Sequence, residues 1–452
     1  MRTRSFARSA LVLLVSSLVL PSAHTTESSE AVAVDPCAVA STPALAILPP
    51  TLDVFSNGSD GALNFIPDVG SPNTMTIDLA QAYSGPGVTW QSISPVQGTG
   101  VYDAAKWAIV FHYTSVTVPA GKTIRFTNHP SNAPVVWLVA GSVTIAGTVD
   151  VSGEVIVMAF AHFMSPGPGG FRGGIGGGFG FDENRAASGF GPGGGRTAPM
   201  EGGAVGAYAT QGSGGTALNI YGNARILPLI GGSGGAGRGG ANNAHSAGGA
   251  GGGAILIAAG DSIVVSGQIL AKAGTPGGSF RAGMGAGGAI RLIAPSVSGA
   301  GSLRATGGTG GLVFPTGGDG RIRIETLSGT VSSTPVASRS TPDSPVLLWP
   351  PSTGPRTTIV SIGNRNAPSD PTSLLDPGTA DVSVLDIGMT TVRIDCDNVP
   401  VNALVTLLVK PKFGDTISTA ATFQTGDATH SQWAALVDLP AGTVVLQVHA
   451  TF

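Results

Sequence analysis

The chain has 452 residues, of which 11 % are charged and 6 % aromatic, whereas 70 are glycine and 32 are proline. A formal net charge of −3 excludes the strongly basic balance that nucleic-acid binding requires, so no nucleic-acid partner is expected. Hydrophobic residues make up 42 % of the chain, which argues against disorder because enough apolar surface is present for a packed core.

Residues 1–23 have the three parts of a secretory signal peptide. Three arginines within the first eight residues form a basic region, residues 10–20 are apolar, and residues 21–23 (Pro-Ser-Ala) form a small-residue cleavage region. No later apolar run reaches the roughly 18 residues of a spanning helix. We therefore expect a mature chain without a membrane span, exported by the Sec pathway to the extracellular space, the cell surface or the periplasm.

The next residues predict an N-terminal β region that follows a short leader. Residues 24–50 are small and polar with several prolines, and we interpret them as a leader or linker. Within residues 51–133, the segments 74–80, 106–118 and 122–127 alternate apolar and polar side chains and are separated by glycine- and proline-containing turns. This pattern is typical of β-strands, so we expect a β cap here.

The middle of the chain contains an imperfect internal repeat. The copies cover residues 136–153, 254–274, 289–308 and 321–333. Ile255 matches Ile290 and Gly267 matches Gly301, and each copy contains short strands separated by small-residue turns and a glycine corner. One copy cannot bury its own apolar face, so the copies must stack. The repeat therefore predicts a right-handed parallel β-helix, a β-solenoid, over residues 134–333.

Glycine-rich tracts separate the copies, mainly within residues 165–195 and 231–253. They lack a strict Gly-X-Y period, which excludes a collagen helix. Two interpretations remain: flexible linkers, or insertions that pack as extended, polyproline-II-like strands with backbone hydrogen bonds where only glycine fits. The apolar side chains within the tracts favour ordered packing, because a pure linker lacks such anchors.

The last part of the chain predicts a separate β domain. Residues 334–356 are rich in proline, serine and threonine and are interpreted as a linker. Residues 357–452 contain about seven strand-like segments with regular turn signals, which favours an immunoglobulin-like β-sandwich. Trp433 is expected in the core of this sandwich.

Four segments carry a resemblance to a known group of proteins, namely residues 106–121, 128–149, 221–237 and 251–259. The chain is similar there to glycine-rich exported bacterial proteins with a predicted right-handed parallel β-helix, a largely uncharacterised group. The resemblance covers roughly half of the chain. It implies an all-β fold with glycine-rich insertions, and it supplies no established catalytic residues.

Candidate binding residues lie in the glycine tracts. Exposed aromatic rings suit stacking on sugars, which makes candidates of Phe171, Phe179, Phe181, Phe190 and Tyr208. The alternative is that these rings anchor the tracts to the strands. Asp182 and Glu183 are candidates for a small ion or sugar site, with a solvated turn as the alternative.

No catalytic residue, metal site or cofactor is expected. Glycoside hydrolysis needs two facing carboxylates, and no pair of acids recurs at the period of the repeat. The histidines and cysteines do not have the spacing of metal ligands. Cys37 and Cys396 would form a disulfide in an oxidising compartment if their Cα atoms are close enough, and two unpaired thiols are the alternative.

These observations together predict a non-catalytic secreted or cell-surface protein. We expect an adhesin-like protein or a scaffold of the extracellular matrix or envelope, with extracellular glycans, envelope components or further copies of itself as partners. The alternative is a carbohydrate-active enzyme or carbohydrate-binding module on the same β-helix, since a fold does not determine a function.

Overall fold

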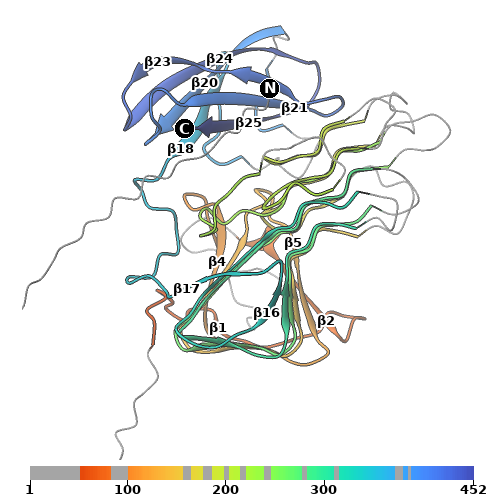
Figure 1. Cartoon of the computed structure of the whole chain (residues 1–452), viewed down its shortest axis with the longest axis vertical. Helices are drawn as coiled ribbons and strands as arrows, with labels where there is room; N and C mark the ends of the chain where they lie inside the picture. The colour runs from red at the N-terminus through yellow and green to blue at the C-terminus, as the bar shows by residue number, and fades with distance from the viewer. Residues whose placement is uncertain are drawn as a thin grey trace, which may run out of the picture. The chain divides into compact units, whose positions relative to one another are not determined.

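The computed structural model describes residues 51–82, 100–155, 164–176, 186–197, 203–213, 220–238, 246–276, 282–309, 315–371, 380–384 and 388–452. This part of the chain is nearly all β, and its one helical element is the three-residue 3-10 turn η1 (Leu79–Gln81). It contains no helix that is long and apolar enough to cross a membrane. Parallel sheets come first along the chain and antiparallel sheets last (Figure 1). The all-β prediction is confirmed.

The parallel strands form three stacks. The first contains the N-terminal half of β4 (Ala108–Val118), β6 (Val135–Val139), β9 (Ala254–Ala259), β12 (Ala289–Ile293), β15 (Arg321–Glu325) and β17 (Ser338–Ser340). The second contains β1 (Gly61–Leu63), the C-terminal half of β4, β7 (Val143–Ile145), β10 (Ser262–Val265) and β13 (Ser296–Ser298). The third contains β2 (Thr74–Asp78), β5 (Thr123–Thr127), β8 (Thr148–Asp150), β11 (Gln268–Leu270), β14 (Ser302–Arg304) and β16 (Ser332–Thr334). The short β3 (Val101–Asp103) pairs antiparallel with β4.

The chain visits the stacks in turn, and equivalent residues of the repeat lie side by side. Ile255 pairs with Ile290, as the sequence alignment predicts. The offset is 35 residues between these two isoleucines and 34 between Ser262 and Ser296, so the third copy is one residue shorter at its first turn. The repeat detected in the sequence is therefore a repeat of strands in register.

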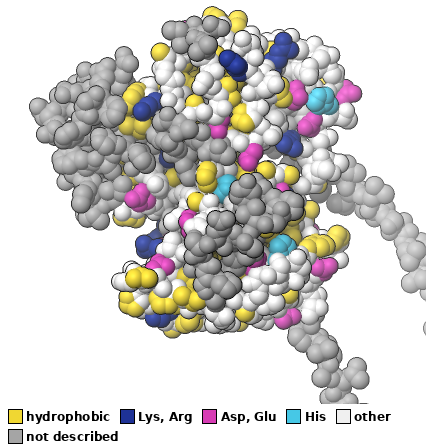
Figure 2. All heavy atoms as spheres, turned by 180° about the vertical axis from the view of Figure 1, so that it is seen from behind, with side chains coloured by type: hydrophobic (Ala, Val, Ile, Leu, Met, Phe, Trp, Pro, Cys, Tyr) yellow, Lys and Arg dark blue, Asp and Glu magenta, His cyan; other side chains and the backbone are white. Residues whose placement is uncertain are grey.

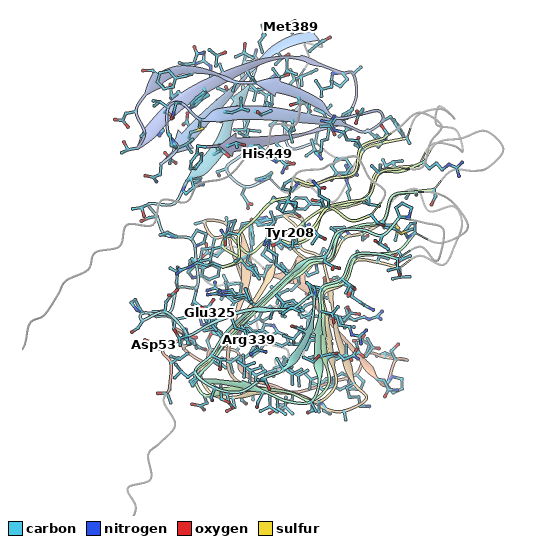
Figure 3. All side chains as sticks on the ribbon, in the orientation of Figure 1. Asp53, Tyr208, Glu325, Arg339, Met389 and His449 are labelled. Carbon is cyan, nitrogen blue, oxygen red and sulfur yellow. The ribbon has the colours of Figure 1, made fainter. Side chains whose placement is uncertain are left out.

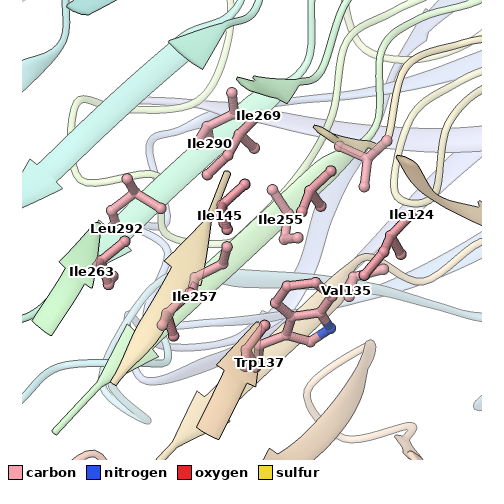
Figure 4. Close-up of a cluster of buried hydrophobic side chains, with 14 of the residues drawn as sticks. Ile124, Val135, Trp137, Ile145, Ile255, Ile257, Ile263, Ile269, Ile290 and Leu292 are labelled. Atoms are coloured by element: carbon pink, nitrogen blue, oxygen red, sulfur yellow. The ribbon is translucent and has the colours of Figure 1, made fainter. Parts of the chain in front are cut away.

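Aliphatic side chains from all three stacks fill the space between them (Figure 4). One passage of the chain through the three stacks is called a coil here. Ile257, Ile263 and Ile269 belong to one coil and are fully buried, and Trp137 packs in the same core. Burying such a side chain contributes about 1.5–3 kcal/mol relative to leaving it exposed. Since every added coil extends the same core, the stability of this region comes from stacking.

The outer face of the first stack is covered by other segments of the chain. Tyr208, Ile226 and Leu229 pack on it together with Val346 and Leu348. The last two belong to the segment that the sequence predicts to be a linker, residues 334–356. This segment also contributes β17, so most of it is docked on the parallel strands instead of hanging between domains.

The glycine tracts form a bundle of extended segments, here called the glycine bundle (residues 164–176, 186–197, 203–213, 231–238, 246–253 and 282–288). The segment 231–238 makes backbone hydrogen bonds to each of the other five segments. A strand in a sheet bonds to two neighbours at most, because its hydrogen bonds lie in one plane. The bundle is therefore a different arrangement from a β-sheet.

The hydrogen bonds of the bundle recur every third residue. Gly232, Gly235 and Arg238 donate their N–H groups to the segment 246–253, each over 2.8 Å. Three residues per turn is the period of a polyproline II helix, which makes no internal hydrogen bonds and is free to bond sideways in several directions. The predicted backbone hydrogen bonds between the tracts are present in these residues, and their period is that of a polyproline II helix.

Glycine is required because the segments approach so closely. A Cβ on Gly235 would lie 2.2 Å from the carbonyl oxygen of Gly283, and one on Gly251 would lie 1.8 Å from that of Gly232. The obstructing atoms are backbone atoms, which cannot rotate away as a side chain would. The tracts can therefore pack this closely only because they are rich in glycine.

Two antiparallel sheets complete the fold. One contains β18 (Arg356–Ile362), β19 (Arg365–Asn366), β20 (Gly388–Asp397), β23 (Thr422–Gly426) and β24 (His430–Leu439). The other contains β21 (Leu404–Pro411), β22 (Ile417–Ala420) and β25 (Val444–Thr451). They share one hydrophobic core, which includes Ile394, Leu407 and Trp433. The expected core position of Trp433 is confirmed.

Candidate functional site

A cleft of about 1110 Å³ lies between the parallel strands and the antiparallel sheets. Its walls come mainly from three stretches of chain, within residues 102–107, 349–371 and 439–448. The first stretch surrounds the turn between β3 and β4, the second is the docked segment with β18, and the third leads into β25. The cleft therefore depends on segments that are far apart in the sequence.

Two tryptophans form part of the cleft wall, and both are only partly buried. The indole N–H of Trp107 donates to the carbonyl oxygen of Ser131 over 2.9 Å. The ammonium group of Lys106 lies 5.0 Å from the ring centroid of Trp349, within the range of a cation–π contact. Each indole is thus held by a polar contact while it lines the cavity.

Tyr102 and Asp370 join the two sides of the cleft. The Tyr102 hydroxyl donates to Asp370 Oδ1 over 2.5 Å, and its ring lies 4.4 Å from the ring of His129. Burial, helped by this hydrogen bond to a carboxylate, raises the pKa of Tyr102 to about 12. Burial lowers the pKa of His129, so this imidazole is neutral at pH 7. The phenol remains protonated and the cleft keeps a stable hydrogen-bonded pair.

The backbone of the cleft is strained at two positions. Among the described residues other than glycine, only five have positive φ, and two of them, Trp107 (φ 47°) and Asn398 (φ 53°), line the cleft. The Asn398 amide donates to the carbonyl oxygens of Ser352 and Gly354, which holds its backbone in place. Such conformations persist only where the surroundings enforce them, and they cluster at functional sites.

The charged groups around the cleft are of both signs. Asp381 and Asp397 add carboxylates, and Lys106 and Arg356 add cations. Asp397 Oδ1 lies 2.8 Å from His430 Nδ1, and this hydrogen bond raises the pKa of His430. Charged side chains are also scattered over the face in Figure 2, with no large patch of one sign. In the described residues, no three His, Cys, Asp or Glu side chains lie together as a metal site would require.

A buried lysine joins the antiparallel sheets to the glycine bundle. Lys410 on β21 is 3 % exposed, and its ammonium group donates to the carbonyl oxygens of Gly189 and Gly191 over 3.0 and 2.9 Å. Next to it, the Ser188 hydroxyl donates to Asp415 over 2.8 Å. Burial lowers the pKa of Lys410 from 10.5 to about 8.

Replacing Lys410 with methionine is expected to change how stability depends on pH. In the wild type, the unfolded chain binds more protons than the folded chain between pH 8 and 10.5, so the free energy of unfolding increases with pH in this window. The Lys410→Met variant should lose that increase, and a variant of the exposed Lys272, Lys272→Met, should keep it. Denaturant unfolding at several pH values measures the free energy of unfolding. If it rose equally steeply with pH in both variants, Lys410 could not be buried in the contact described.

The predicted binding residues in the tracts take different positions. Phe190 is 4 % exposed and lies under the guanidinium group of Arg172, which is 3.9 Å from its ring centroid. Tyr208 is fully buried and its hydroxyl donates to the carbonyl oxygen of Ile230 over 2.9 Å (Figure 3). Phe171 is half-buried, and its ring lies against Gly191. Neither Phe190 nor Tyr208 presents an exposed ring, which favours the anchoring interpretation for both.

The remaining candidates are only partly described. Phe179, Phe181, Asp182 and Glu183 lie outside the described residues, so their proposed role in binding stays a prediction. Cys396 is buried in the core of the antiparallel sheets and forms no disulfide with another described residue, and burial raises the pKa of its thiol to about 11. Cys37 also lies outside the described residues, so a disulfide between the two cysteines stays a prediction.

The sequence analysis missed the residues of the cleft. Trp349 lies in a Pro-, Ser- and Thr-rich stretch that was interpreted as a linker, and Trp107 lies at the start of a predicted strand. In the sequence, the only indication of the cleft was that these two tryptophans stand close to residues typical of turns.

Comparison of the chain with protein-family models, with curated proteins and with solved structures gives no match. The function therefore has to be inferred from the geometry of the cleft and of the surfaces around it.

Proposed function

We propose that this chain is a non-catalytic protein of the cell surface or extracellular space that binds glycans in its cleft. Its location is inferred from the signal peptide of residues 1–23. Its scaffold is a right-handed parallel β-helix, which is supported by the three stacks that the chain visits in turn and by the right-handed preference of parallel crossovers. The antiparallel sheets, packed on one core, form an immunoglobulin-like sandwich.

The observation that carries the proposal is the pair of partly exposed indoles in the cleft wall. The apolar C–H faces of a sugar ring pack on the face of an aromatic ring, and sugar hydroxyls hydrogen-bond to nearby polar groups. Here Trp107 and Trp349 supply the rings, while Asp370 and Asp381 supply carboxylates. A site with charges of both signs suits a neutral glycan better than a highly charged one.

Binding without cleavage is proposed because the acids have other partners. Asp370 accepts a hydrogen bond from Tyr102, and Asp397 is paired with His430. A glycosidase needs one carboxyl group as the acid and a second as the base or nucleophile, both directed at the same bond. A carbohydrate-active enzyme remains the second candidate, and it would reveal itself by depolymerisation of a polysaccharide.

Replacing Trp349 with alanine is expected to weaken glycan binding at least tenfold, because an aromatic anchor at the centre of a site contributes about 2 kcal/mol or more. The test is a glycan array with the mature chain from residue 24, followed by titration of any ligand found. Phe423→Ala is the control, since Phe423 is a partly exposed aromatic residue of the antiparallel sheets that does not line the cleft. Circular dichroism checks that both variants fold.

Three results would contradict the proposal. The wild type could bind no glycan on the array, or the Trp349→Ala and Phe423→Ala variants could bind equally well. Release of oligosaccharides from a polysaccharide by the wild type would instead support the enzyme.

A further inference from the structure

One loop contacts both the wall of the cleft and the glycine bundle. It consists of residues 128–132, lies between β5 and β6, and is here called the hub loop. Toward the cleft, the carbonyl oxygen of Ser131 accepts the indole N–H of Trp107. Toward the bundle, the amide group of Asn128 donates to the carbonyl oxygen of Pro166 over 2.6 Å. A change in the conformation of the hub loop would therefore reach the cleft.

The side chain of His129 holds the hub loop in shape. His129 is 8 % exposed, and its Nδ1 accepts the backbone N–H of Ser131 over 3.1 Å. The hydroxyl oxygen of Ser131 lies 2.8 Å from the same nitrogen atom. The carbonyl oxygen of His129 accepts the N–H of Asn132 over 2.7 Å, which closes the turn. The imidazole thus takes the place that an Asn or Asp side chain has in many turns, where it accepts the N–H two residues further on.

These hydrogen bonds require a neutral imidazole at residue 129. A backbone N–H is always a donor, so Nδ1 can accept from Ser131 only through a free lone pair. In the neutral ring one nitrogen donates and the other accepts, whereas in the cation both nitrogens donate. A proton on Nδ1 would face the N–H of Ser131 and break the contact. The shape of the hub loop therefore depends on the protonation state of His129.

The surroundings of the ring also disfavour the cation. Tyr102 on β3 lies against it, with the two ring centroids 4.4 Å apart. The charge of Asp370, from the segment after β19, favours the cation, and so does a hydrogen bond to the backbone of Ala82 beside η1. Burial outweighs both contributions, so the pKa of His129 is lower than its ordinary value of 6.5.

We propose that His129 is a positioning residue that makes the cleft sensitive to acid. With a neutral ring, the hub loop presents the carbonyl oxygen of Ser131 to the indole of Trp107, and the ring supports Tyr102. With a protonated ring, the contact to Ser131 is lost and the indole loses its fixed acceptor. The cleft is then no longer preorganised, so glycans bind more weakly in acid. This inference rests on the glycan binding proposed for the cleft.

The direction of the effect follows from the linkage between protonation and opening of the hub loop. In the opened loop His129 has its ordinary pKa of 6.5, whereas in the closed loop its pKa is lower. The opened loop therefore binds more protons at any pH between these two values. Opening becomes more favourable as the pH falls, by up to about tenfold per pH unit. Carboxylic acids titrate mainly below about pH 5, so measurements between about pH 7 and 5 report on histidine.

The test compares the wild type with His129→Asn. The amide oxygen of asparagine can still accept the N–H of Ser131, as in an Asx-turn, but it does not titrate. The control is His430→Asn. His430 hydrogen-bonds to Asp397 of the cleft wall without lining the cleft, and that bond raises its pKa, so it also gains a proton in this window.

The first measurement needs no glycan. NMR gives the protection of the Trp107 indole N–H against solvent exchange, relative to the intrinsic exchange rate at each pH. From pH 7 to pH 5 we expect this protection to fall at least about threefold in the wild type and in His430→Asn, and to stay constant in His129→Asn. The indole N–H of Trp433, which donates to Ser431 in the antiparallel sheets, should stay equally protected in the wild type and in His129→Asn.

The second measurement is the affinity for a glycan found on the array, at the same pH values. We expect the wild type and His430→Asn to bind at least about threefold more weakly at pH 5 than at pH 7, and His129→Asn to bind equally at both. Glycan affinity of the wild type that is independent of pH would overturn the proposal. So would Trp107 protection that does not fall in the wild type, or that falls equally in His129→Asn.

The ring nitrogen resonances of His129 in the wild type add a result that does not depend on any variant. A proton on Nδ1 at pH 7 would overturn the proposal, because Nδ1 could not then accept from Ser131. If the wild type binds no glycan at any pH, the function proposed for the cleft fails. The exchange of the Trp107 indole N–H still shows in that case whether His129 controls the cleft wall.

Discussion

Replacing Gly235 with alanine is expected to lower the free energy of unfolding of the glycine bundle by about 3 kcal/mol or more. The added methyl carbon would lie 2.2 Å from the carbonyl oxygen of Gly283 and 2.3 Å from its carbonyl carbon. Both atoms belong to a neighbouring backbone, so the two segments must separate. Their separation strains the backbone hydrogen bonds of the segment 231–238 to its neighbours. Hydrogen exchange of the bundle amides and thermal unfolding measure the loss.

The adjacent residue provides a matched control. Ala236 lies on the same segment and carries a Cβ that the bundle accommodates while it is fully buried. The Ala236→Gly variant should cost no more than about 1 kcal/mol, the usual effect of the greater flexibility of glycine. If Gly235→Ala and Ala236→Gly proved equally mild, the segments could not be packed as closely as the structure describes.

The stability of the bundle has an unusual origin for a folded region. Each ordered glycine loses more conformational entropy than any other residue, and it has no side chain to bury. The compensation comes from backbone hydrogen bonds, which contribute about 1 kcal/mol each, and from a few apolar anchors. Tyr208 of the bundle packs on the first stack, together with Ile226 and Leu229, which lie just before the bundle segment 231–238. The tracts therefore depend on the parallel strands for their order, which explains why they occur between copies of the repeat.

The parts of the fold that could be predicted are those with a local period. Ile255 and Ile290 could be aligned because each strand of a stack repeats the residue types of its neighbour. The ordered tracts could be predicted because apolar residues interrupt the glycines. The direction of an aromatic ring could not be predicted, since a three-residue period does not show which side faces the strands. The structure shows that Phe190 and Tyr208 face inward and are buried.

The cleft could not be predicted because its walls come from residues far apart in the sequence. Tyr102 and Asp370, which are hydrogen-bonded across it, are separated by 268 residues. The interpretation of residues 334–356 as a linker relied on composition, but this segment is docked by β17, by Val346 and Leu348, and by contacts to one buried cation. Arg291 on β12 is 1 % exposed and donates to the carbonyl oxygens of Leu347 and Leu348. An arginine inside a predicted strand gives no indication of that role.

Replacing Glu325 with alanine is expected to cost about 3–5 kcal/mol of stability, because it leaves a buried guanidinium group without its counter-ion. Arg291 Nε donates to Glu325 Oε1 over 2.9 Å, and both side chains are at most 2 % exposed. Arg323 Nε also lies 3.3 Å from the same oxygen, so two cations would lose their partner. Denaturant unfolding measures the loss. Limited proteolysis within residues 341–356 shows whether the docked segment is released.

Two further variants show whether the loss of stability comes from an unpaired buried charge or from the replacement of any charged residue near the docked segment. Arg291→Met combined with Glu325→Leu removes both charges of the fully buried pair and keeps an apolar side chain at each site. Arg323 stays charged, but it is partly exposed and keeps its hydrogen bond to the Ser340 hydroxyl, so most of the stability should return. The carbonyl oxygens of Leu347 and Leu348 would still lack their donor, so the segment should remain sensitive to protease although the parallel strands are stable. Arg225→Ala, which breaks an exposed pair with Asp343, should cost less than about 1 kcal/mol. Full resistance of the double variant to protease would mean that Val346 and Leu348 hold the segment by themselves and that Arg291 does not position the wall of the cleft.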